Sequence, residues 1–500
     1  MFLDAPQSIW QWFDGTLPSP AIAVLASYAK TLYDIKVCDL NVVKKPWEEL
    51  KRVLTEYRPD LIAIPCTHTC HINEVKGCLQ MIRKFHPQAL IVGGGVHFHV
   101  FYKELIEEGL IDFACLGEGE LTFSQLAGKL SIFYEAKRSG KKLTPEEKIA
   151  GLMAVDGLAF MANGEVVKTA PRKQIQDLDS IPLPSYELFP MEKYRIPIFG
   201  GAETFGITFG RGCQNKCCFC SESFGWDYTL RRNSPEYAVR HIELLYKNFG
   251  RSTYIFADTD FLVNADWVRL FIELLKKKDL KINFHIQTCV TSVLRNESLI
   301  QPLKEAGLFE IMLGTESPFS EVLKKLKKPQ RDPQIMIKAM ETVKRHGVLL
   351  MTMMLWGTEF DSRETLRKGL EFFDRYSDIV CPNALTPYPG TPLYYELKEK
   401  GLIKEENFGL YDQGHVIVPA GKMTYAETQD TFASELTRCH ALNWKFYMKL
   451  FSENKFLRYN QYYYVKLVWS RMLEGFLSSG KYVKEIYAKK EFEKIMSQPE

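Results

Sequence analysis

The sequence predicts an α/β protein in which a doubly wound, Rossmann-like parallel sheet precedes a partial β/α barrel and a C-terminal helical region. Short apolar runs alternate with amphipathic helical segments over roughly the first 130 residues. The alternation resumes near residue 204 with six further strand runs, and after about residue 420 the pattern is helical. Buried strands separated by helices are typical of parallel sheets that are covered on both faces.

Five buried runs are expected to form the first sheet: MFLDAP at 1–6, IKVCDL at 35–40, PDLIAIPCT at 59–67, ALIVGGGVH at 89–97 and DFACLGEGE at 112–120. Amphipathic segments such as WEELKRVLTEY and INEVKGCLQMIRKF lie between them. Sheets of this type bind ligands at the carboxyl ends of their strands. Those ends therefore mark the expected ligand site of the first domain.

The next segment, 136–200, is less regular. GLMAVDGLAFMANGEVVKT predicts a hairpin that turns at Asn163–Gly164. The proline-punctuated stretch DLDSIPLPSYELFP is typical of a linker on the surface.

The barrel is predicted from six strands separated by helices such as SPEYAVRHIELLYKNF and ADWVRLFIELLKKK. The expected strands cover 204–209, 253–257, 282–288, 309–314, 348–355 and 379–385. The chemistry of such barrels gathers at the C-terminal strand ends. The domains expected from these patterns are a sheet domain at 1–135, a hairpin and linker at 136–200, the barrel at 201–420 and a helical domain at 421–500.

Composition is that of a globular protein, with 46% hydrophobic and 25% charged residues and a net charge of +3. This balance argues against a general electrostatic grip on nucleic acid or acidic lipid, and leaves a local basic patch open. The N-terminus has no basic, apolar signal pattern, and no apolar run is long enough to span a bilayer. We expect a cytoplasmic protein whose twelve cysteines are reduced.

The stretch GCQNKCCFC places Cys213, Cys217 and Cys220 in a CxxxCxxC pattern directly after the first barrel strand. Three thiolates on one loop can ligate three corners of a [4Fe–4S] cluster and leave the fourth iron open for a small bidentate molecule. Structural zinc is the alternative, but it wants four protein ligands, and the fourth would be Cys218 or a distant group. Cys218 is expected to point away from the other three.

The loop resembles the signature of the radical S-adenosylmethionine (SAM) superfamily, in which an aromatic residue such as Phe219 commonly precedes the last cysteine. The resemblance implies a [4Fe–4S] cluster and SAM. LGTES at 313–317 resembles an element that reaches the ribose and amino acid of SAM. Relatives carry a GGE-type motif where this chain has FADTDF, so Asp258 or Asp260 stands in its place, with a helix N-cap as the alternative for either. The SAM-binding residues implied are Phe219, Asp258, Gln287, Gly314, Glu316 and Ser317.

The first domain, followed by such a barrel, resembles the cobalamin-binding domain of a subgroup of this family. The loop DAPQSIW lacks the DxHxxG motif that supplies a histidine to cobalt, so the cofactor is expected in its base-off form. His68 is a candidate to ligate cobalt or pack over it, and an exposed loop imidazole is the alternative. Cys66, Cys70 and Cys78 are interpreted as ordinary thiols rather than ligands of a second cluster. The implied cobalamin contacts are Gln7, Thr67, His68, Gly93, Gly94, Gly95, His97, Gly117, Glu118 and Gly119.

The resemblance implies an enzyme that cleaves SAM reductively to a 5′-deoxyadenosyl radical and functionalises an unactivated carbon, with electrons from an external donor such as flavodoxin or ferredoxin. Methyl transfer from methylcobalamin is the expected reaction. Radical oxidation or cyclisation, as in the oxygen-independent cyclase of bacteriochlorophyll synthesis, is the first alternative, and a non-catalytic iron–sulfur or corrinoid carrier the second. RYNQYYYVKLVW at 458–469 could wall a large apolar or aromatic small-molecule substrate, with helical core packing as the alternative.

Overall fold

The computed structural model describes residues 1–7, 17–196, 199, 204–440, 442–477 and 483–498. The chain forms two compact units. The N-terminal unit comprises Met1–Ile9, Pro18–Lys193 and Tyr482–Glu500, and the barrel unit comprises Trp10–Leu17 and Tyr194–Lys481. The C-terminal segment thus returns to the unit in which the chain begins.

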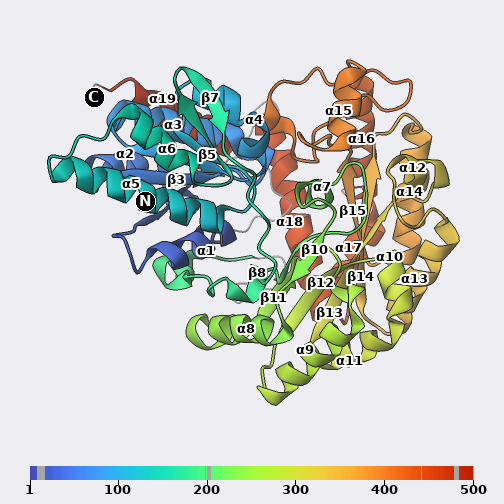
Figure 1. The fold of residues 1–500 in the computed structure, drawn as a ribbon. Helices are drawn as coiled ribbons and strands as arrows, with labels where there is room; N and C mark the ends of the chain where they lie inside the picture. Colours follow the sequence, from blue (N-terminus) through green and yellow to red (C-terminus); the bar gives the residue numbers. More distant parts are fainter. Residues whose placement is uncertain (8–16, 197–198, 200–203, 441, 478–482, 499–500) are drawn as a thin grey trace. The chain divides into compact units, whose positions relative to one another are not determined.

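The N-terminal unit is built on a seven-stranded sheet with the order β2-β1-β3-β4-β5-β6-β7. The first five of these strands are parallel, as predicted: β1 (Phe2–Asp4), β2 (Val37–Asp39), β3 (Leu61–Pro65), β4 (Leu90–Gly94) and β5 (Phe113–Cys115). Its helices, seen in the upper left of Figure 1, are α1 (Pro20–Ala29), α2 (Pro46–Glu56), α3 (Ile72–Phe85), α4 (Val96–Glu107), α5 (Gly119–Arg138) and α6 (Pro145–Met153). The α/β alternation is confirmed.

The predicted hairpin is present and extends this sheet. Strands β6 (Leu158–Ala162) and β7 (Glu165–Lys168) are antiparallel, and β6 pairs with β5. Asn163 and Gly164 have φ of 51° and 85°, the left-handed pair that a two-residue hairpin turn requires. The hairpin is therefore part of the N-terminal sheet rather than a separate element.

The helix α19 (Val483–Met496) packs on α2 and completes the N-terminal unit. The rings of Trp47 and Phe492 lie 4.9 Å apart. A Cβ added at Gly77 would stand 2.9 Å from the Trp47 ring and 3.5 Å from the Phe492 ring, so this glycine leaves the room that the pair needs. The backbone carbonyl of Met496 accepts a hydrogen bond from Lys84.

The barrel unit contains a six-stranded parallel sheet with the order β15-β14-β13-β12-β11-β8. All six predicted strands are present: β8 (Thr204–Ile207), β11 (Thr253–Phe256), β12 (Asn283–Cys289), β13 (Leu308–Glu316), β14 (Leu349–Trp356) and β15 (Ile379–Ala384). Strands of consecutive β/α units are neighbours in the sheet, and the two outer strands, β8 and β15, are not paired with each other in the described residues. The partial barrel is confirmed.

Helices cover the outer face of this sheet, as Figure 1 shows. Those between the strands are α7 (Ser221–Gly225), α8 (Pro235–Phe249), α9 (Ala265–Lys277), α10 (Val290–Arg295), α11 (Ile300–Glu305), α12 (Ser320–Lys325), α13 (Pro333–Arg345) and α14 (Arg363–Tyr376). Packed rings hold α9 to the sheet: Phe256 lies 5.0 Å from Phe284 and 5.8 Å from Phe271. The helices after β15 are α15 (Pro392–Glu399), α16 (Tyr425–Cys439), α17 (Trp444–Met448) and α18 (Lys455–Leu477).

The first turns of α18 pack on the inner face of the sheet. Phe456, Leu457 and Tyr463 form one apolar cluster with residues of β13, β14 and β15. A buried polar group lies beside it: Glu310 accepts hydrogen bonds from His285 Nδ1 at 2.8 Å and from Asn460 Nδ2 at 3.2 Å. These bonds satisfy a fully buried carboxylate and tie α18 to β12 and β13.

Candidate functional site

The cysteine loop follows β8 and a small antiparallel pair, β9 (Gly210–Gly212) with β10 (Leu230–Arg232). Two backbone bonds hold it over the carboxyl edge of the barrel sheet. Cys218 N donates to Leu326 O at 3.2 Å, after α12, and Leu393 N of α15 donates to Cys218 O at 3.0 Å. The loop is thus fixed by two elements that are distant in sequence.

The thiols of Cys213, Cys217 and Cys220 are neighbours in a poorly solvated place. Burial raises the pKa of the Cys217 thiol to about 12; Lys328 opposes this rise, and Glu316, Cys220 and Cys213 reinforce it. Burial also raises the pKa of Cys220, whose position is the N-cap of α7. Within the described ranges no three His, Cys, Asp or Glu side chains already stand in the arrangement of a metal site.

The donor set nevertheless fits a thiolate-ligated cluster. Three soft donors come from one loop, the Cys217 thiol interacts electrostatically with the other two, and the Lys328 ammonium lies near Cys217. A nearby cation favours the thiolate form in which cysteine binds metal.

Cys218 points away from these three thiols, as predicted. Its side chain is in an apolar cluster with Val322, Leu326 and Leu393, and its Sγ lies 3.4 Å from Lys325 O. Phe219 is half-buried against the same cluster.

Glu316, at the end of β13, forms a buried ion pair with Lys328. The distance from Lys328 Nζ to Glu316 Oε1 is 2.9 Å, and the two side chains are 6% and 9% exposed. Burial alone would lower the pKa of Lys328, but Glu316, Cys217 and Cys289 together raise it above its ordinary value. The lysine is therefore a permanent cation beside the cysteine loop, and the sequence analysis did not single it out.

The backbone around Glu316 is shaped for this pair. The register of β13 against β14 shifts between Gly314 and Glu316, and Glu316 has a φ of 64°. Such irregularities re-aim side chains at the ends of strands. A Cβ at Gly314 would stand 3.2 Å from Glu316 Oε1 and 3.5 Å from Lys328 Nζ, so the glycine leaves room for the pair. Ser317 is buried, and its Oγ accepts from Phe319 N at 3.2 Å.

The two aspartates after β11 have partners within the protein. Asp258 Oδ2 accepts from Phe209 N at 3.2 Å, and its Oδ1 lies 3.5 Å from Arg232 Nε. Asp260 accepts from Thr288 Oγ1 and Ser292 Oγ, both at 2.6 Å, and from Cys289 N. Asp260 stands at the N-cap position of the 3-10 turn η7 (Phe261–Val263) but makes no capping bond there; its carboxylate instead ties the end of β12 to the start of α10.

Cys289, the last residue of β12, is a second residue that the sequence analysis missed. Its Sγ accepts from Asn215 Nδ2 of the cysteine loop at 3.1 Å. Burial, then Asp260, raises the pKa of its thiol, Lys328 opposes that rise, and Cys213 adds to it. Gln287 lies two residues before it, half-buried on the same face of the strand. No local motif marks Cys289, because only the fold brings it to the loop.

In the N-terminal unit, the predicted cobalamin residues gather at the carboxyl edge of the parallel strands. Pro65 pairs with Gly94, and Gly93 with Ala114, so the loops after β3, β4 and β5 are neighbours. Two glycines there are required by the protein's own packing. A Cβ at Gly93 would stand 2.4 Å from the Phe98 ring, and one at Gly95, where φ is 95°, would stand 2.7 Å from Cys66 O. Gly94 and Gly119 meet only ordinary contacts.

The other predicted residues of this edge differ in exposure. Gln7, Thr67 and His68 are exposed, and Thr67 Oγ1 lies 3.2 Å from His68 Nδ1. His97 is buried in α4, its ring 4.7 Å from Phe101, and burial lowers its pKa to about 3. Glu118 is buried and accepts from Ile175 N, while Gly117 has a φ of 89°. Ser8, Ile9 and Trp10 of the loop after β1 lie outside the described residues.

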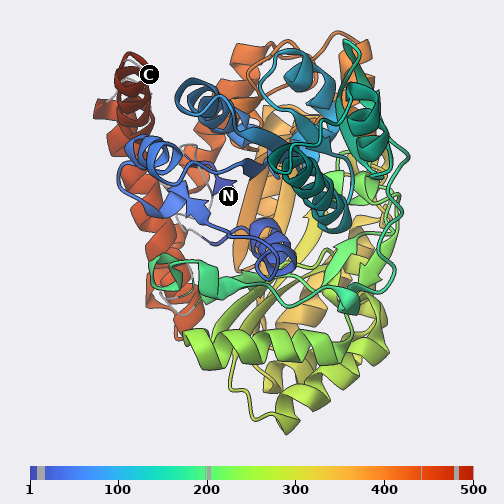
Figure 2. The ribbon, with the colours of Figure 1, turned by 60° about the vertical axis from the view of Figure 1, so that its left-hand side comes forward.

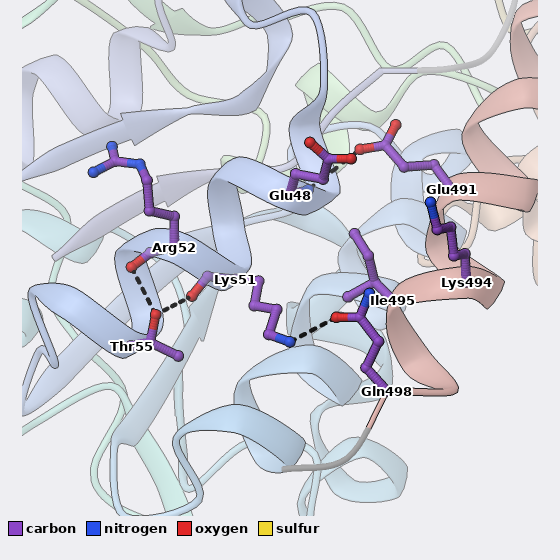
Figure 3. A pocket seen from close by; sticks show the side chains of 8 residues that line it. All are labelled: Glu48, Lys51, Arg52, Thr55, Glu491, Lys494, Ile495 and Gln498. Carbon is purple, nitrogen blue, oxygen red and sulfur yellow. Dashed lines mark hydrogen bonds between the residues drawn. The ribbon is translucent and has the colours of Figure 1, made fainter.

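A surface pocket of about 290 Å³ lies elsewhere in the N-terminal unit, between α2 and the C-terminal segment. Figure 3 shows its lining, in which Lys51 Nζ donates to Gln498 Oε1 at 2.7 Å and Glu491 accepts from Glu48 N at 3.2 Å. The lining residues come from α2 and the C-terminal segment, so the pocket is separate from the strand ends described above.

Comparison with known proteins finds a domain of known family in each of the two units. Residues 207–369 match the family described as the radical SAM superfamily, and residues 12–127 match the B12 binding domain. An uncharacterized methyltransferase of Pyrococcus horikoshii is 28% identical over 400 residues, covering 79% of this chain and 82% of the relative. The anaerobic magnesium-protoporphyrin IX monomethyl ester cyclase of Rubrivivax gelatinosus is 28% identical over 452 residues, covering 89% of this chain and 76% of the relative.

Among solved structures, the cobalamin-dependent S-adenosylmethionine radical enzyme OxsB, with aqua-cobalamin and S-adenosylmethionine bound, has the same fold. The TM-score is 0.69 at 16% sequence identity, over 99% of this chain and 75% of OxsB. The chain therefore contains a radical SAM domain preceded by a B12-binding domain.

Proposed function

We propose that the protein is a cobalamin-dependent radical SAM methyltransferase that acts on a small molecule. The observation that carries the proposal is the meeting of three thiols from one loop with the buried Lys328–Glu316 pair at the carboxyl edge of the barrel sheet. A carrier of iron–sulfur clusters would need no charged pair beside the cluster ligands.

Cys213, Cys217 and Cys220 are proposed to hold a [4Fe–4S] cluster, which, when bound, supplies the electron that cleaves SAM. Lys328 provides a fixed positive charge that offsets the charge of three thiolates. Glu316, Gly314 and Ser317 are placed where β13 ends, so they suit the amino-acid and ribose groups of SAM. Phe219, Gln287 and Asp258 complete the proposed SAM site, with Asp258 acting through its contact with Arg232.

Cobalamin is proposed to bind the carboxyl edge of the N-terminal sheet, in the domain expected at 1–135. Open backbone at Gly94 and Gly117 permits a close approach, because a Cβ there would clash with nothing in the protein. Gln7, Thr67 and His68 offer exposed polar groups at the same edge. Gly93 and Gly95 allow the tight packing of the loop after β4. Gly119, His97 and Glu118 lie beside these loops and are proposed to hold them in place for the cofactor. The barrel at 201–420 would then hold SAM, while most of 136–200 and the end of 421–500 belong to the N-terminal unit.

Oxidative cyclisation without methyl transfer is the second candidate. The likeness to the magnesium-protoporphyrin cyclase, which extends over 89% of this chain, favours it. A large apolar or aromatic substrate would suit either reaction. An external electron donor such as flavodoxin or ferredoxin and a cytoplasmic location belong to both proposals.

The test is anaerobic reconstitution of the protein with iron, sulfide and cobalamin, followed by addition of SAM and reductant. We expect 5′-deoxyadenosine together with S-adenosylhomocysteine, and neither product from Cys217→Ala. 5′-Deoxyadenosine without S-adenosylhomocysteine would favour cyclisation. An intact cluster that yields neither product would identify a carrier and overturn the proposal.

A further inference from the structure

The C-terminal helices of the barrel unit expose a group of large apolar side chains. Trp444 and Phe451 are 68% and 77% exposed, far more than a folded core leaves open. They lie in α17 and in the 3-10 turn η10 (Lys449–Phe451), which pack against α18. We name this set the C-terminal apolar face; its members are Leu442, Trp444, Met448, Phe451, Tyr459, Tyr462 and Trp469.

Helix α18 is two-sided. Phe456, Asn460 and Tyr463 are buried against the sheet. Tyr459, Tyr462 and Trp469 recur at a spacing of three and seven residues, which places them together on the other side of the helix. Figure 2 shows α18, in red, with one side turned away from the rest of the barrel unit. The exposed rings thus form a stripe and are not a by-product of core packing.

The same segment is strongly basic. Residues 442–469 contain five Lys or Arg side chains and one Glu, a net charge of +4 against +3 for the whole chain. Lys445, Lys455 and Lys466 are exposed, and within the described part of the chain they form no ion pair. The other two cations have partners nearby. Lys449 forms an ion pair with Asp374 at 3.6 Å, and Arg458 donates hydrogen bonds to the carbonyls of Ser452 and Glu453.

We propose that the C-terminal apolar face docks on the surface of an anionic lipid bilayer. Trp and Tyr prefer the headgroup level of membranes, and lysines around them are attracted to acidic lipids. No helix in the described ranges is long and apolar enough to cross a membrane, so the contact is superficial.

Charge and composition favour a bilayer over a protein partner. Four of the five cations are lysines, and lysine is depleted in protein–protein interfaces, where arginine is preferred. The excess positive charge complements a diffuse negative surface and not a single acidic residue. Because exposed charges are screened by salt, binding should weaken as ionic strength rises.

The test measures co-sedimentation of the full-length protein with vesicles of equal parts phosphatidylglycerol and phosphatidylcholine, and with vesicles of phosphatidylcholine alone. We expect binding to the anionic vesicles and at least about ten-fold weaker binding to the neutral ones. Trp444→Ala/Phe451→Ala and Lys445→Glu/Lys455→Glu/Lys466→Glu should each reduce binding to anionic vesicles by at least about ten-fold.

Matched controls are available in the same unit. Phe360→Ala/Tyr395→Ala removes two other exposed rings, and Lys276→Glu/Lys277→Glu/Lys281→Glu makes the same charge change on and after α9. Both controls should bind as the parent protein does. Binding that the face variants leave unchanged, or that the controls lose equally, overturns the proposal. So does a face that mediates self-association, or that captures RNA, without binding vesicles.

Discussion

Lys328 joins the two halves of the proposed SAM site. Its ammonium lies 2.9 Å from Glu316 and interacts with the thiols of Cys217 and Cys289. Each of these groups is buried, and Glu316, Cys217 and Cys289 together hold Lys328 in its charged form. Removing one partner leaves the rest in a poorly solvated place without compensation.

Replacement of Lys328 by Met should therefore destabilise the protein by roughly 3–5 kcal/mol, because the buried Glu316 carboxylate loses its partner. Lys328→Met/Glu316→Gln should recover most of this loss, while SAM binding stays impaired in both variants. Urea unfolding and equilibrium binding of SAM separate the two effects. Full SAM affinity in the double variant would show that the pair serves only stability.

The cysteines make a sharper prediction. Cys213→Ala, Cys217→Ala and Cys220→Ala should each abolish the visible absorbance and iron content of the reconstituted protein. Cys218→Ala, in its apolar cluster, should retain both.

Cys289→Ser tests whether the metal site has three cysteine ligands, which leaves one position open for SAM, or four. Its thiol interacts with that of Cys213 and accepts from Asn215, so it is a candidate to complete a four-cysteine site. We expect the variant to keep its iron, because three ligands suffice. Loss of iron equal to that in Cys213→Ala would mean a closed site, as structural zinc prefers.

At the scale of elements, the strands and most helices could be predicted because buried parallel strands give apolar runs of clear length. The ends of β11 and β12 fall within one residue of the prediction. The pair β9–β10 could not be predicted, because strands of three residues show no periodicity.

In the proposed site, the spacing of Cys213, Cys217 and Cys220 is a local signal that the sequence shows directly. Lys328, in contrast, lies in the lysine-rich run KKLKKPQR, which is typical of a solvated surface. Its partners become visible only in the folded protein, where β13 brings Glu316 and the cysteine loop brings Cys217 to Lys328.

The docking of α19 on α2 includes one aromatic pair. Phe492→Ala removes a ring 4.9 Å from Trp47 and should cost about 3 kcal/mol of the helix's attachment. Compared with the parent protein, we expect Phe492→Ala to show faster hydrogen exchange or proteolysis in 483–496, with exchange in the barrel strands unchanged. Lys489→Ala, on the same helix, is the matched control, because the Lys489 side chain is 75% exposed. Equal exchange in Phe492→Ala and Lys489→Ala would contradict the prediction.

At the scale of the whole molecule, each unit contains a histidine that is held neutral by burial. Burial lowers the pKa of His97 to about 3 and that of His241 to about 4, from 6.5. In the unfolded chain both take up a proton near pH 6.5, while the folded chain does not. The free energy of unfolding should therefore fall as pH drops below about 6.5, by roughly 1.4 kcal/mol per pH unit for each histidine.

His241→Gln should flatten this dependence for the barrel unit down to about pH 4, where the folded state itself would be protonated. Urea unfolding near pH 7.5 and near pH 5 measures the difference between parent and variant. His346→Gln, at the half-exposed end of α13, serves as the control. A variant that loses as much stability as the parent does would show that other groups carry the acid sensitivity.

The return of α19 to the N-terminal unit sets an order of events during biosynthesis. When the ribosome has finished the strands of the first sheet, the ring of Trp47 still lacks its cover, because Phe492 is made only after the entire barrel. The nascent N-terminal sheet must wait for the whole of Tyr194–Lys481 before its last helix arrives. The surface of α2 around Trp47 therefore stays without its C-terminal cover until the barrel has been synthesised.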